Sequence, residues 1–329
     1  MACDDGELAR HEAEVARQRA LQNRRGTAQS LSALAGSVRK RGDLARATVL
    51  YSESLALFRE LGDTRATARQ LASLGALSQV DGDASSSDDY ARARALYEQA
   101  ATFYEEALAL ARSDEDQQMI ALLLTNLGQV ASFQSSLDQA DARYDEALAV
   151  SKSLGDKAMR ARILGNKGLV ALARDDRGLE IALYREGLAL CREIGDRAGA
   201  SWLFHNLAAA LATDPAQVVA LHDEELARAR HAGDIESVAS QLRTLGRLAR
   251  QRGDDAQAEA LYEESLPLLR QLGWRGVLPW RLYELGQLAQ KRGDLRRARA
   301  LYEESLATLI DLGQDTATVR AALAQIASA

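Results

Sequence analysis

Side chains that could do chemistry are few in this chain, and they are scattered. Four His and two Cys occur among 329 residues, and none is spaced like the ligands of a zinc site. No Ser, His and Asp, and no Cys and His, can be brought together as a nucleophile with its base. Residues 165–168 read GNKG, which is only part of the phosphate-binding pattern G-x(4)-G-K-[ST]. We therefore expect no enzyme activity, no metal and no cofactor.

One short stretch has the oxygen-rich spacing of a calcium loop. Its side chains are Asp81, Asp83, Ser85, Ser87 and Asp89. A calcium loop of this kind ends on a bidentate Glu, and Arg92 takes that place. The pattern therefore favours an ordinary loop, which we place at residues 85–87.

An internal sequence repeat defines the helices that would carry any binding site. The pattern Y-x-x-[ASG]-L begins at six Tyr residues, at intervals of 53, 40, 40, 78 and 40. They are Tyr51, Tyr104, Tyr144, Tyr184, Tyr262 and Tyr302. His222 divides the long interval into 38 and 40, and His11 lies forty residues before the first Tyr. Eight repeats are therefore in register, with one insertion of thirteen residues and one deletion of two.

The dipeptide Gly-Asp marks the joints between helices. Gly adopts the left-handed conformation that ends a helix, and Asp accepts hydrogen bonds from the first amides of the next. The dipeptide begins at Gly42, Gly62, Gly82, Gly155, Gly195, Gly233, Gly253 and Gly293. The spacing predicts a first helix over 5–22 and a last over 315–328. Between them it predicts pairs over 24–41 and 44–61, 64–81 and 88–114, 116–133 and 137–154, 157–174 and 177–194, 197–212 and 216–232, 235–252 and 255–272, and 276–292 and 295–312.

Within each repeat the pattern is L-G-x(11)-A-x(3)-Y-x(2)-[AS]-L, as at residues 127–148, 245–266 and 285–306. This resembles the tetratricopeptide repeat, although the period is nearer forty residues than the usual thirty-four. It is similar to the long-helix variant in the C-terminal sensor arrays of bacterial signalling ATPases and of maltose-regulator-type transcription regulators. The resemblance implies a single all-α, right-handed superhelix over 1–329 with about seven and a half repeats. Capping helices fill 1–23 and 313–329, seven pairs fill 24–312, and an insertion lies near 84–96.

The large side chain that recurs in every repeat has two interpretations, a ladder of ligand-binding groups or the packing of helices. We favour packing, because a solenoid needs a large residue at a fixed place in each repeat. Cys191 lies seven residues after Tyr184 on one helix face, so we interpret it as a buried core thiol. Lys167, Glu180 and Glu225 depart from the pattern, which leaves sequence drift, a bend or a partner contact open between about 165 and 230.

The resemblance implies a concave groove lined by the first helix of each pair, at positions −6, −3, +1, +4 and +5 from the repeat Gly. The predicted partner-binding residues are Trp202, His205, Arg243, Arg247, Arg250, Trp280, Tyr283, Gln287 and Gln290. Earlier repeats contribute Arg39, Lys40, Arg69, Leu122, Thr125, Gln129, Ser132 and Phe133. Arg beside aromatic residues is typical of binding hot spots, and Arg suits carboxylate or phosphate. The alternative is a solvated Arg face with half-buried Trp side chains.

Composition and charge narrow the class of partner. The formal net charge of −6 disfavours a general nucleic-acid binder, which needs a basic face. No apolar run approaches the roughly 18 residues of a membrane span, and the acidic N-terminus lacks a secretory pattern. Cys3 and Cys191 lie too far apart in a linear array to suggest a disulfide. We therefore expect a cytoplasmic protein that binds neither nucleic acid nor membrane.

Two functions remain open from the sequence. The first is a non-catalytic scaffold that binds a protein or an extended peptide, with carboxylate or acidic groups, in the groove. The second is the sensor arm of a larger signalling ATPase or transcription regulator. We expect a monomer; the alternative is a second copy that packs on Leu309, Ile310, Leu323 and Ile326.

Overall fold

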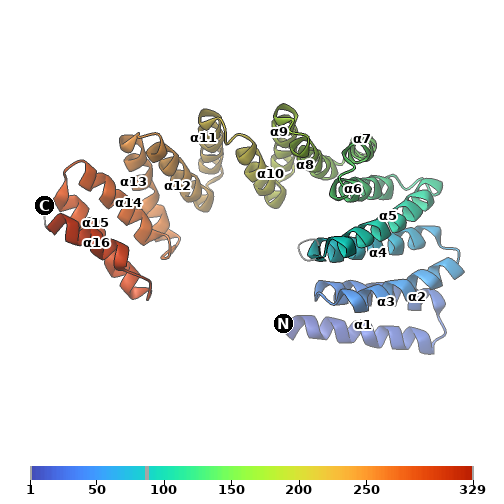
Figure 1. Cartoon of the computed structure of the whole chain (residues 1–329). Helices are drawn as coiled ribbons and strands as arrows, with labels where there is room; N and C mark the ends of the chain where they lie inside the picture. The colour runs from blue at the N-terminus through green and yellow to red at the C-terminus, as the bar shows by residue number, and fades with distance from the viewer. Residues whose placement is uncertain (1, 86–88, 328–329) are drawn as a thin grey trace. The chain divides into compact units, whose positions relative to one another are not determined.

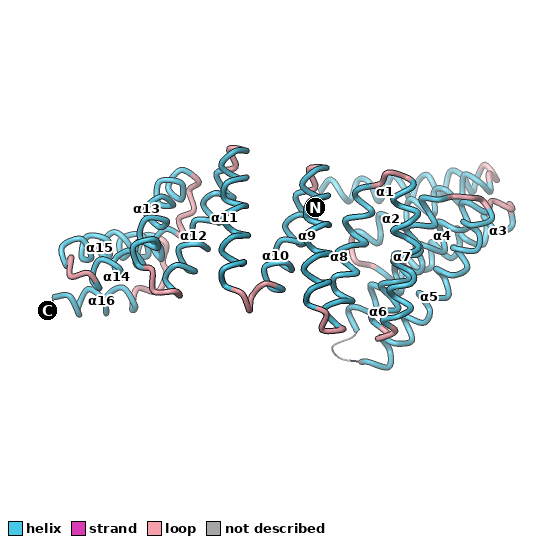
Figure 2. Tube along the Cα trace, turned by 90° about the horizontal axis from the view of Figure 1, so that it is seen from above, coloured by secondary structure: helices cyan, strands magenta, loops and turns pink. Residues whose placement is uncertain are grey.

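The structure is a computed structural model that describes residues 2–85 and 89–327. These residues form sixteen α-helices joined by short loops and contain no strand (Figures 1 and 2). The predicted all-α architecture of helix pairs is therefore confirmed. The helices fall into two compact units, residues 1–210 and 211–329. That both units belong to one solenoid over 1–329 stays a prediction.

The first unit contains ten helices, each packed against its neighbours in the chain. They are α1 (Ala2–Ala20), α2 (Arg24–Lys40), α3 (Leu44–Glu60), α4 (Thr64–Ser85), α5 (Tyr90–Ser113), α6 (Gln117–Phe133), α7 (Leu137–Ser153), α8 (Lys157–Ala173), α9 (Arg177–Ile194) and α10 (Arg197–Ala210). One hydrophobic cluster extends from α1 to α8. This continuity is expected of a repeat array, in which each repeat buries its apolar face against the next.

The second unit contains six helices, again packed in chain order. They are α11 (Pro215–Ala232), α12 (Ile235–Gln251), α13 (Asp255–Gln271), α14 (Leu278–Lys291), α15 (Leu295–Asp311) and α16 (Ala317–Ala327). Leu309 is fully buried, and Leu323 and Ile326 pack on the cluster that contains Tyr302. Three of the four residues considered for a second copy thus pack within the chain, whereas Ile310 stays exposed.

Most helix joints follow the predicted chemistry. Gly42 has a φ of +84°, and the following Asp43 accepts a 3.0 Å hydrogen bond from the Arg46 amide. Asp at the same place caps most of the later helices. Four joints place Gln22, Glu115, Ser135 and Asp175 in the left-handed region instead of Gly. The repeat spacing located these joints even though the dipeptide is absent there.

The recurring Tyr is a packing residue, as the sequence predicted. Tyr144, Tyr262 and Tyr302 are at most 1% exposed. Each ring packs against the repeat Gly of the paired helix, and a Cβ on Gly128 would come within 2.5 Å of the Tyr144 ring. Because the helix pair closes onto this contact, neither the Gly nor the Tyr is free to face a ligand.

The insertion differs from the prediction. Gly82 and Asp83 do not form a joint, because α4 continues as a helix to Ser85. The Tyr97 ring packs on Gly82 in the same way as the Tyr104 ring packs on Gly75. The two contacts lie seven residues apart on each of the two antiparallel helices. The insertion therefore lengthens the α4–α5 hairpin, and the predicted extension of the second helix is confirmed. The predicted loop at 85–87 lies largely outside the described residues.

Within each unit, ion pairs connect neighbouring odd-numbered helices: α1 to α3, α3 to α5, α5 to α7, α11 to α13, and α13 to α15. An Arg eight residues after the repeat Tyr or His pairs with a Glu two residues after the next repeat Tyr. The pairs are Arg19–Glu53, Arg59–Glu106, Arg112–Glu146, Arg230–Glu264 and Arg270–Glu304. These solvent-exposed pairs set the register between neighbours more than they add stability.

The α8–α9 pair, whose sequence departs from the repeat pattern, packs like the other pairs. Lys167 pairs with Asp141 at 3.2 Å, and Glu180 is 3% exposed at the place where other repeats have Ala. Burial raises the pKa of the Glu180 carboxyl above its ordinary value. The division of the chain falls later, between Ala210 and Leu211, inside the pair predicted at 197–212 and 216–232.

Candidate binding surface

Charge is segregated between the two sets of helices. The even-numbered helices, α2 to α16, carry seventeen Lys and Arg but only four Asp and Glu. The odd-numbered helices, α1 to α15, carry nineteen Lys and Arg and twenty-seven Asp and Glu. The net charge of −6 therefore conceals one basic set of helices and one acidic set. A net charge alone does not describe the surface that a partner meets.

The even-numbered helices line a groove in the first unit. Helix α8 contacts both α6 and α10 directly, which places successive even-numbered helices side by side. A cavity of about 730 Å³ is lined by side chains from α2, α4, α6 and α8, together with Tyr51 and Phe58 of α3. It includes Arg39, Arg69 and Leu122, so the structure brings these three predicted groove residues together. Thr125 was predicted wrongly, because it is fully buried and bonds to the Ala121 carbonyl at 2.7 Å.

Several Arg side chains on this groove have no carboxylate partner among the described residues. Arg39 makes no hydrogen bond or ion pair there, and Arg69 donates only to the Arg65 carbonyl, at 3.3 Å. Arg162 donates to the Met159 sulfur at 2.8 Å. On the odd-numbered helices, in contrast, most Arg side chains pair with Asp or Glu. A fourth Arg of the groove, Arg25, pairs with Asp63 at 3.2 Å, so the groove has more Arg side chains than carboxylates.

A second basic surface lies on α12 and α14 of the second unit. Arg250 donates to the Gln287 side chain at 3.2 Å, and Gln287 donates to the Tyr283 hydroxyl at 3.0 Å. Arg243 and Arg247 are exposed, and the described part of the chain gives neither one a hydrogen bond or ion pair. Two adjacent even-numbered helices are thus connected by polar contacts beside two unpaired guanidinium groups.

Arg281 belongs to the same surface and was not predicted from the sequence. It is 4% exposed, lies 4.1 Å above the centre of the Tyr262 ring and pairs with Glu284. Burial lowers the pKa of its guanidinium. The equivalent positions of α6 and α8 hold Leu123 and Ile163, both fully buried. A charged residue where other repeats have an apolar one was the signal that could have revealed it.

Comparisons with known proteins agree with the fold of helix pairs. A family model described as tetratricopeptide repeat matches residues 238–272, which span most of α12 and all of α13. The solved structure of the apo form of RapI superposes with a TM-score of 0.54 at 12% identity, over 87% of this chain and 98% of that one. The chain has the fold of a tetratricopeptide-repeat protein.

Two other solved structures are similar. Aspartyl phosphate phosphatase F from Bacillus subtilis gives a TM-score of 0.50 at 12% identity, over 87% of this chain and 72% of that one. BtubC (BKLC) from P. vanneervenii gives 0.49 at 20% identity, over 82% and 92%. At these identities the similarity concerns the fold alone. No curated protein matches the chain. The closer resemblance to sensor arrays of signalling ATPases and maltose-type regulators stays a prediction.

The tetratricopeptide fold distributes the predicted site residues over both compact units. Trp202 and His205 lie on α10 in the first unit, and the other seven lie on α12 and α14 in the second. Trp202 is 43% exposed and Trp280 is 42% exposed. Gln290 accepts a 2.8 Å hydrogen bond from the Tyr302 hydroxyl, so part of its side chain serves packing. That these nine residues bind a partner stays a prediction.

The described residues hold no group of three or more His, Cys, Asp and Glu side chains that could bind a metal ion. Asp81 and Asp89 of the calcium-like stretch are engaged otherwise, because Arg92 pairs with Asp81 at 3.3 Å and Asp89 caps α5. Cys191 is buried, as predicted, and burial raises the pKa of its thiol. Within the described ranges, each helix is too short or too polar to cross a membrane.

Proposed function

We propose that this chain is a non-catalytic protein-interaction module whose even-numbered helices bind an acidic segment of a partner protein. One observation carries the proposal: five Arg side chains of these helices have no carboxylate partner among the described residues, namely Arg39, Arg69, Arg162, Arg243 and Arg247. Other Arg side chains of these helices are paired, and those of the odd-numbered helices are mostly paired within the chain. An Arg guanidinium that lacks an internal partner forms strong bidentate hydrogen bonds with a carboxylate from outside.

The groove of the first unit favours an extended peptide over a compact ligand. Its lining combines Arg39 and Arg69 with amide side chains such as Asn126 and with apolar ones such as Met119 and Leu122. Amides match the peptide groups of an extended chain, and apolar contacts match its side chains. A nucleic acid would need stacking or phosphate contacts throughout, which these amide and apolar side chains do not supply.

A second candidate function uses the same surface. The forty-residue period resembles that of sensor arrays, so this surface would be the ligand-binding arm of a larger signalling ATPase or transcription regulator. The two functions differ in what is joined to the array, and the neighbouring reading frame distinguishes them.

The proposal is tested by affinity capture from the native cell extract with three versions of the chain. Arg243→Glu with Arg247→Glu reverses two charges of an even-numbered helix that have no carboxylate partner among the described residues. Arg296→Glu reverses an exposed charge on odd-numbered α15 that likewise has no partner among them. We expect the double variant to lose acidic partner proteins and Arg296→Glu to retain them, with helix content and melting unchanged in both. Capture of the same proteins by all three versions would contradict the proposal, and so would displacement of the partner by an oligonucleotide.

A further inference from the structure

The insertion gives the α4–α5 hairpin an end that extends beyond the neighbouring helix pairs (Figure 1). The added turns of α5 begin at Tyr90 and lie beside the joint between α6 and α7. A cavity of about 560 Å³ separates α5 from this joint, and we refer to it as the hairpin cavity. None of the residues that line the groove of the first unit lines the hairpin cavity. The proposed function therefore leaves this surface unused.

Two stacked rings form one wall of the hairpin cavity. The rings of Tyr97 and Phe133 are parallel to within 3°, with centres 5.1 Å apart. Tyr97 is 6% exposed, and its hydroxyl donates to Asp83 at 2.8 Å, which fixes the ring. Phe133 is 52% exposed, because only one face of its ring lies against Tyr97. The stack thus ends in an open ring face, on which a further flat group can stack.

The packing of helix pairs does not require an aromatic residue at the position of Phe133. This position lies five residues after the repeat Gly, and its counterparts in other repeats are aliphatic or polar. They are Val80, Ala173, Gln251 and Lys291. Tyr90 lines the same cavity and is 75% exposed. Single exposed apolar residues are ordinary, whereas a group of exposed aromatic side chains around a cavity is typical of an interaction surface.

The charge around the hairpin cavity is negative. Residues 84–160 contain thirteen Asp and Glu and seven Lys and Arg, a difference equal to the net charge of −6 of the whole chain. On the cavity itself, Glu98 pairs with the Arg94 guanidinium at 3.0 Å through Oε1. The other oxygen, Oε2, has no hydrogen bond among the described residues. A cation is therefore attracted to a cavity that offers it both a ring face and a carboxylate oxygen.

We propose that the hairpin cavity binds an Arg side chain from a basic segment of a partner protein. The guanidinium stacks on the open face of Phe133 and donates to Glu98. Arg is favoured over Lys because its planar, weakly hydrated end group stacks on a ring and still donates hydrogen bonds in its own plane. The acidic surroundings repel nucleic acid and anionic membranes. The chain then has two docking surfaces of opposite charge, the hairpin cavity and the basic even-numbered helices.

Calorimetric titration of the full chain tests the proposal at about 150 mM salt, where distant charges are screened. The probe is the peptide acetyl-Gly-Arg-Leu-Arg-Gly-amide. One matched peptide has citrulline in place of both Arg residues, which keeps the planar end group and removes its charge, and a second has Lys. We expect the Arg peptide to bind at least about tenfold more tightly than the citrulline peptide. It should bind at least about threefold more tightly than the Lys peptide.

Two variants with matched controls locate the binding. Glu98→Gln removes the carboxylate, and Glu303→Gln is its control, because Glu303 pairs with Arg299 at the same 3.0 Å and with similar exposure. Phe133→Leu removes the ring but keeps an apolar cover on Tyr97, whereas Phe133→Tyr retains the ring face. We expect Glu98→Gln to weaken the Arg peptide at least about tenfold and Phe133→Leu at least about threefold. Both controls should bind as the unchanged chain does, with helix content and melting the same throughout.

The proposal is overturned if the Arg peptide binds no more tightly than the citrulline or the Lys peptide, or if no peptide binds at millimolar concentration. Equal effects of Glu98→Gln and Glu303→Gln, or no effect of Phe133→Leu, would also overturn it. So would self-association in sedimentation that Phe133→Leu abolishes, because a second copy would then occupy the cavity. These outcomes are distinct from failure of the proposed function, since the capture experiment changes Arg243 and Arg247 of the second unit.

Discussion

Substitution of a single repeat glycine, Gly168→Ala, is the sharpest test of how the helix pairs hold together. An Ala in place of Gly within a helix normally stabilises it by about 1 kcal/mol. At this position the new methyl group would lie within 3.0 Å of three atoms of the Tyr184 ring. Tyr184 is fully buried, so the ring has no solvent to move into, and the two helices must separate.

The magnitude follows from these opposing effects. Overpacking of a closed contact costs about 1–3 kcal/mol, which exceeds the intrinsic gain from Ala. We expect Gly168→Ala to lower the stability of the α8–α9 pair by about 1–2 kcal/mol. Gly36→Ala is the matched control, because a Cβ there meets only the Tyr51 hydroxyl, at 3.6 Å. This control should instead stabilise α2 by up to about 1 kcal/mol.

Hydrogen exchange with mass spectrometry is the suitable assay, since a repeat array does not unfold as one two-state body. Amides of α8 and α9 should exchange about five- to thirty-fold faster in Gly168→Ala, and those of α2 should exchange more slowly in Gly36→Ala. A further variant, Gly168→Ala with Tyr184→Leu, removes the clashing ring, and the methyl group should then cost less. The reasoning is refuted if both glycine substitutions protect their helices equally.

Three further predictions concern charge. Burial raises the pKa of Tyr302 to about 12 from the ordinary value of about 10. As the pH rises, the hydroxyl therefore loses its proton in the unfolded chain before it does in the folded one. The contribution of Tyr302 to the free energy of unfolding should be complete below about pH 10 and fall by up to about 1.4 kcal/mol per pH unit above it. Equal melting temperatures at about pH 8 and pH 11 would exclude this. Glu284→Ala leaves the buried Arg281 without its carboxylate partner and should lower the local stability that hydrogen exchange of the α13 and α14 amides reports by about 3–5 kcal/mol. Addition of Arg281→Met should restore most of that loss, and no restoration would show that the pair is not the cause. Arg230→Ala breaks only an exposed ion pair with Glu264, so the same assay should show a change in stability below about 1 kcal/mol. A larger change would mean that this pair contributes substantially to stability.

Helix order and boundaries could be predicted because they depend on local chemistry that repeats. Gly-Asp joints and a fixed Tyr spacing place most helix ends within two residues of the observed ones. Gly82 shows the limit of that reasoning. The Gly-Asp dipeptide is the same as elsewhere, but the ring of Tyr97 from the paired helix packs on Gly82. This contact favours continuation of the α4 helix over a turn. A tertiary contact of this kind is not visible in the dipeptide itself.

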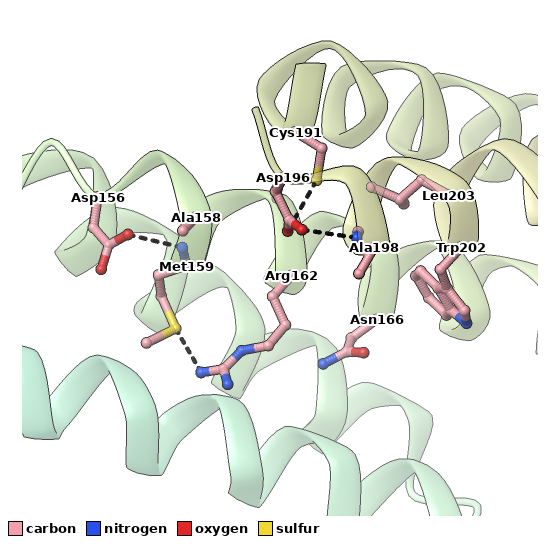
Figure 3. A pocket seen from close by; sticks show the side chains of 12 residues that line it. Asp156, Ala158, Met159, Arg162, Asn166, Cys191, Asp196, Ala198, Trp202 and Leu203 are labelled. Carbon is pink, nitrogen blue, oxygen red and sulfur yellow. Dashed lines mark hydrogen bonds between the residues drawn. The ribbon is translucent and has the colours of Figure 1, made fainter. Parts of the chain in front are cut away.

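The site was predicted less completely, for a related reason. Positions counted from the repeat Gly identified Arg39, Arg69 and Leu122 on the groove, because a helix face follows from spacing. They did not identify the cavity lined by Met159, Trp202 and Leu203 (Figure 3), because its walls come from two helices and from the packing of Trp202 on Gly165. The orientation of Asn166 into that space required the packed helices.

The ladder of Arg–Glu pairs on the odd-numbered helices has a consequence for how such a chain can change in length. Every rung uses the same two positions, one eight residues and one two residues after the large repeat side chain. When a repeat between two such positions is removed or copied, its two neighbours meet with the same Arg and the same Glu, and the ion pair forms again without any new substitution. Insertions within a repeat, such as the one in α4 and α5, lengthen a hairpin along its own axis and leave the rungs in register. The array can therefore become longer or shorter in steps of about forty residues while its neighbouring repeats keep the same ion pairs.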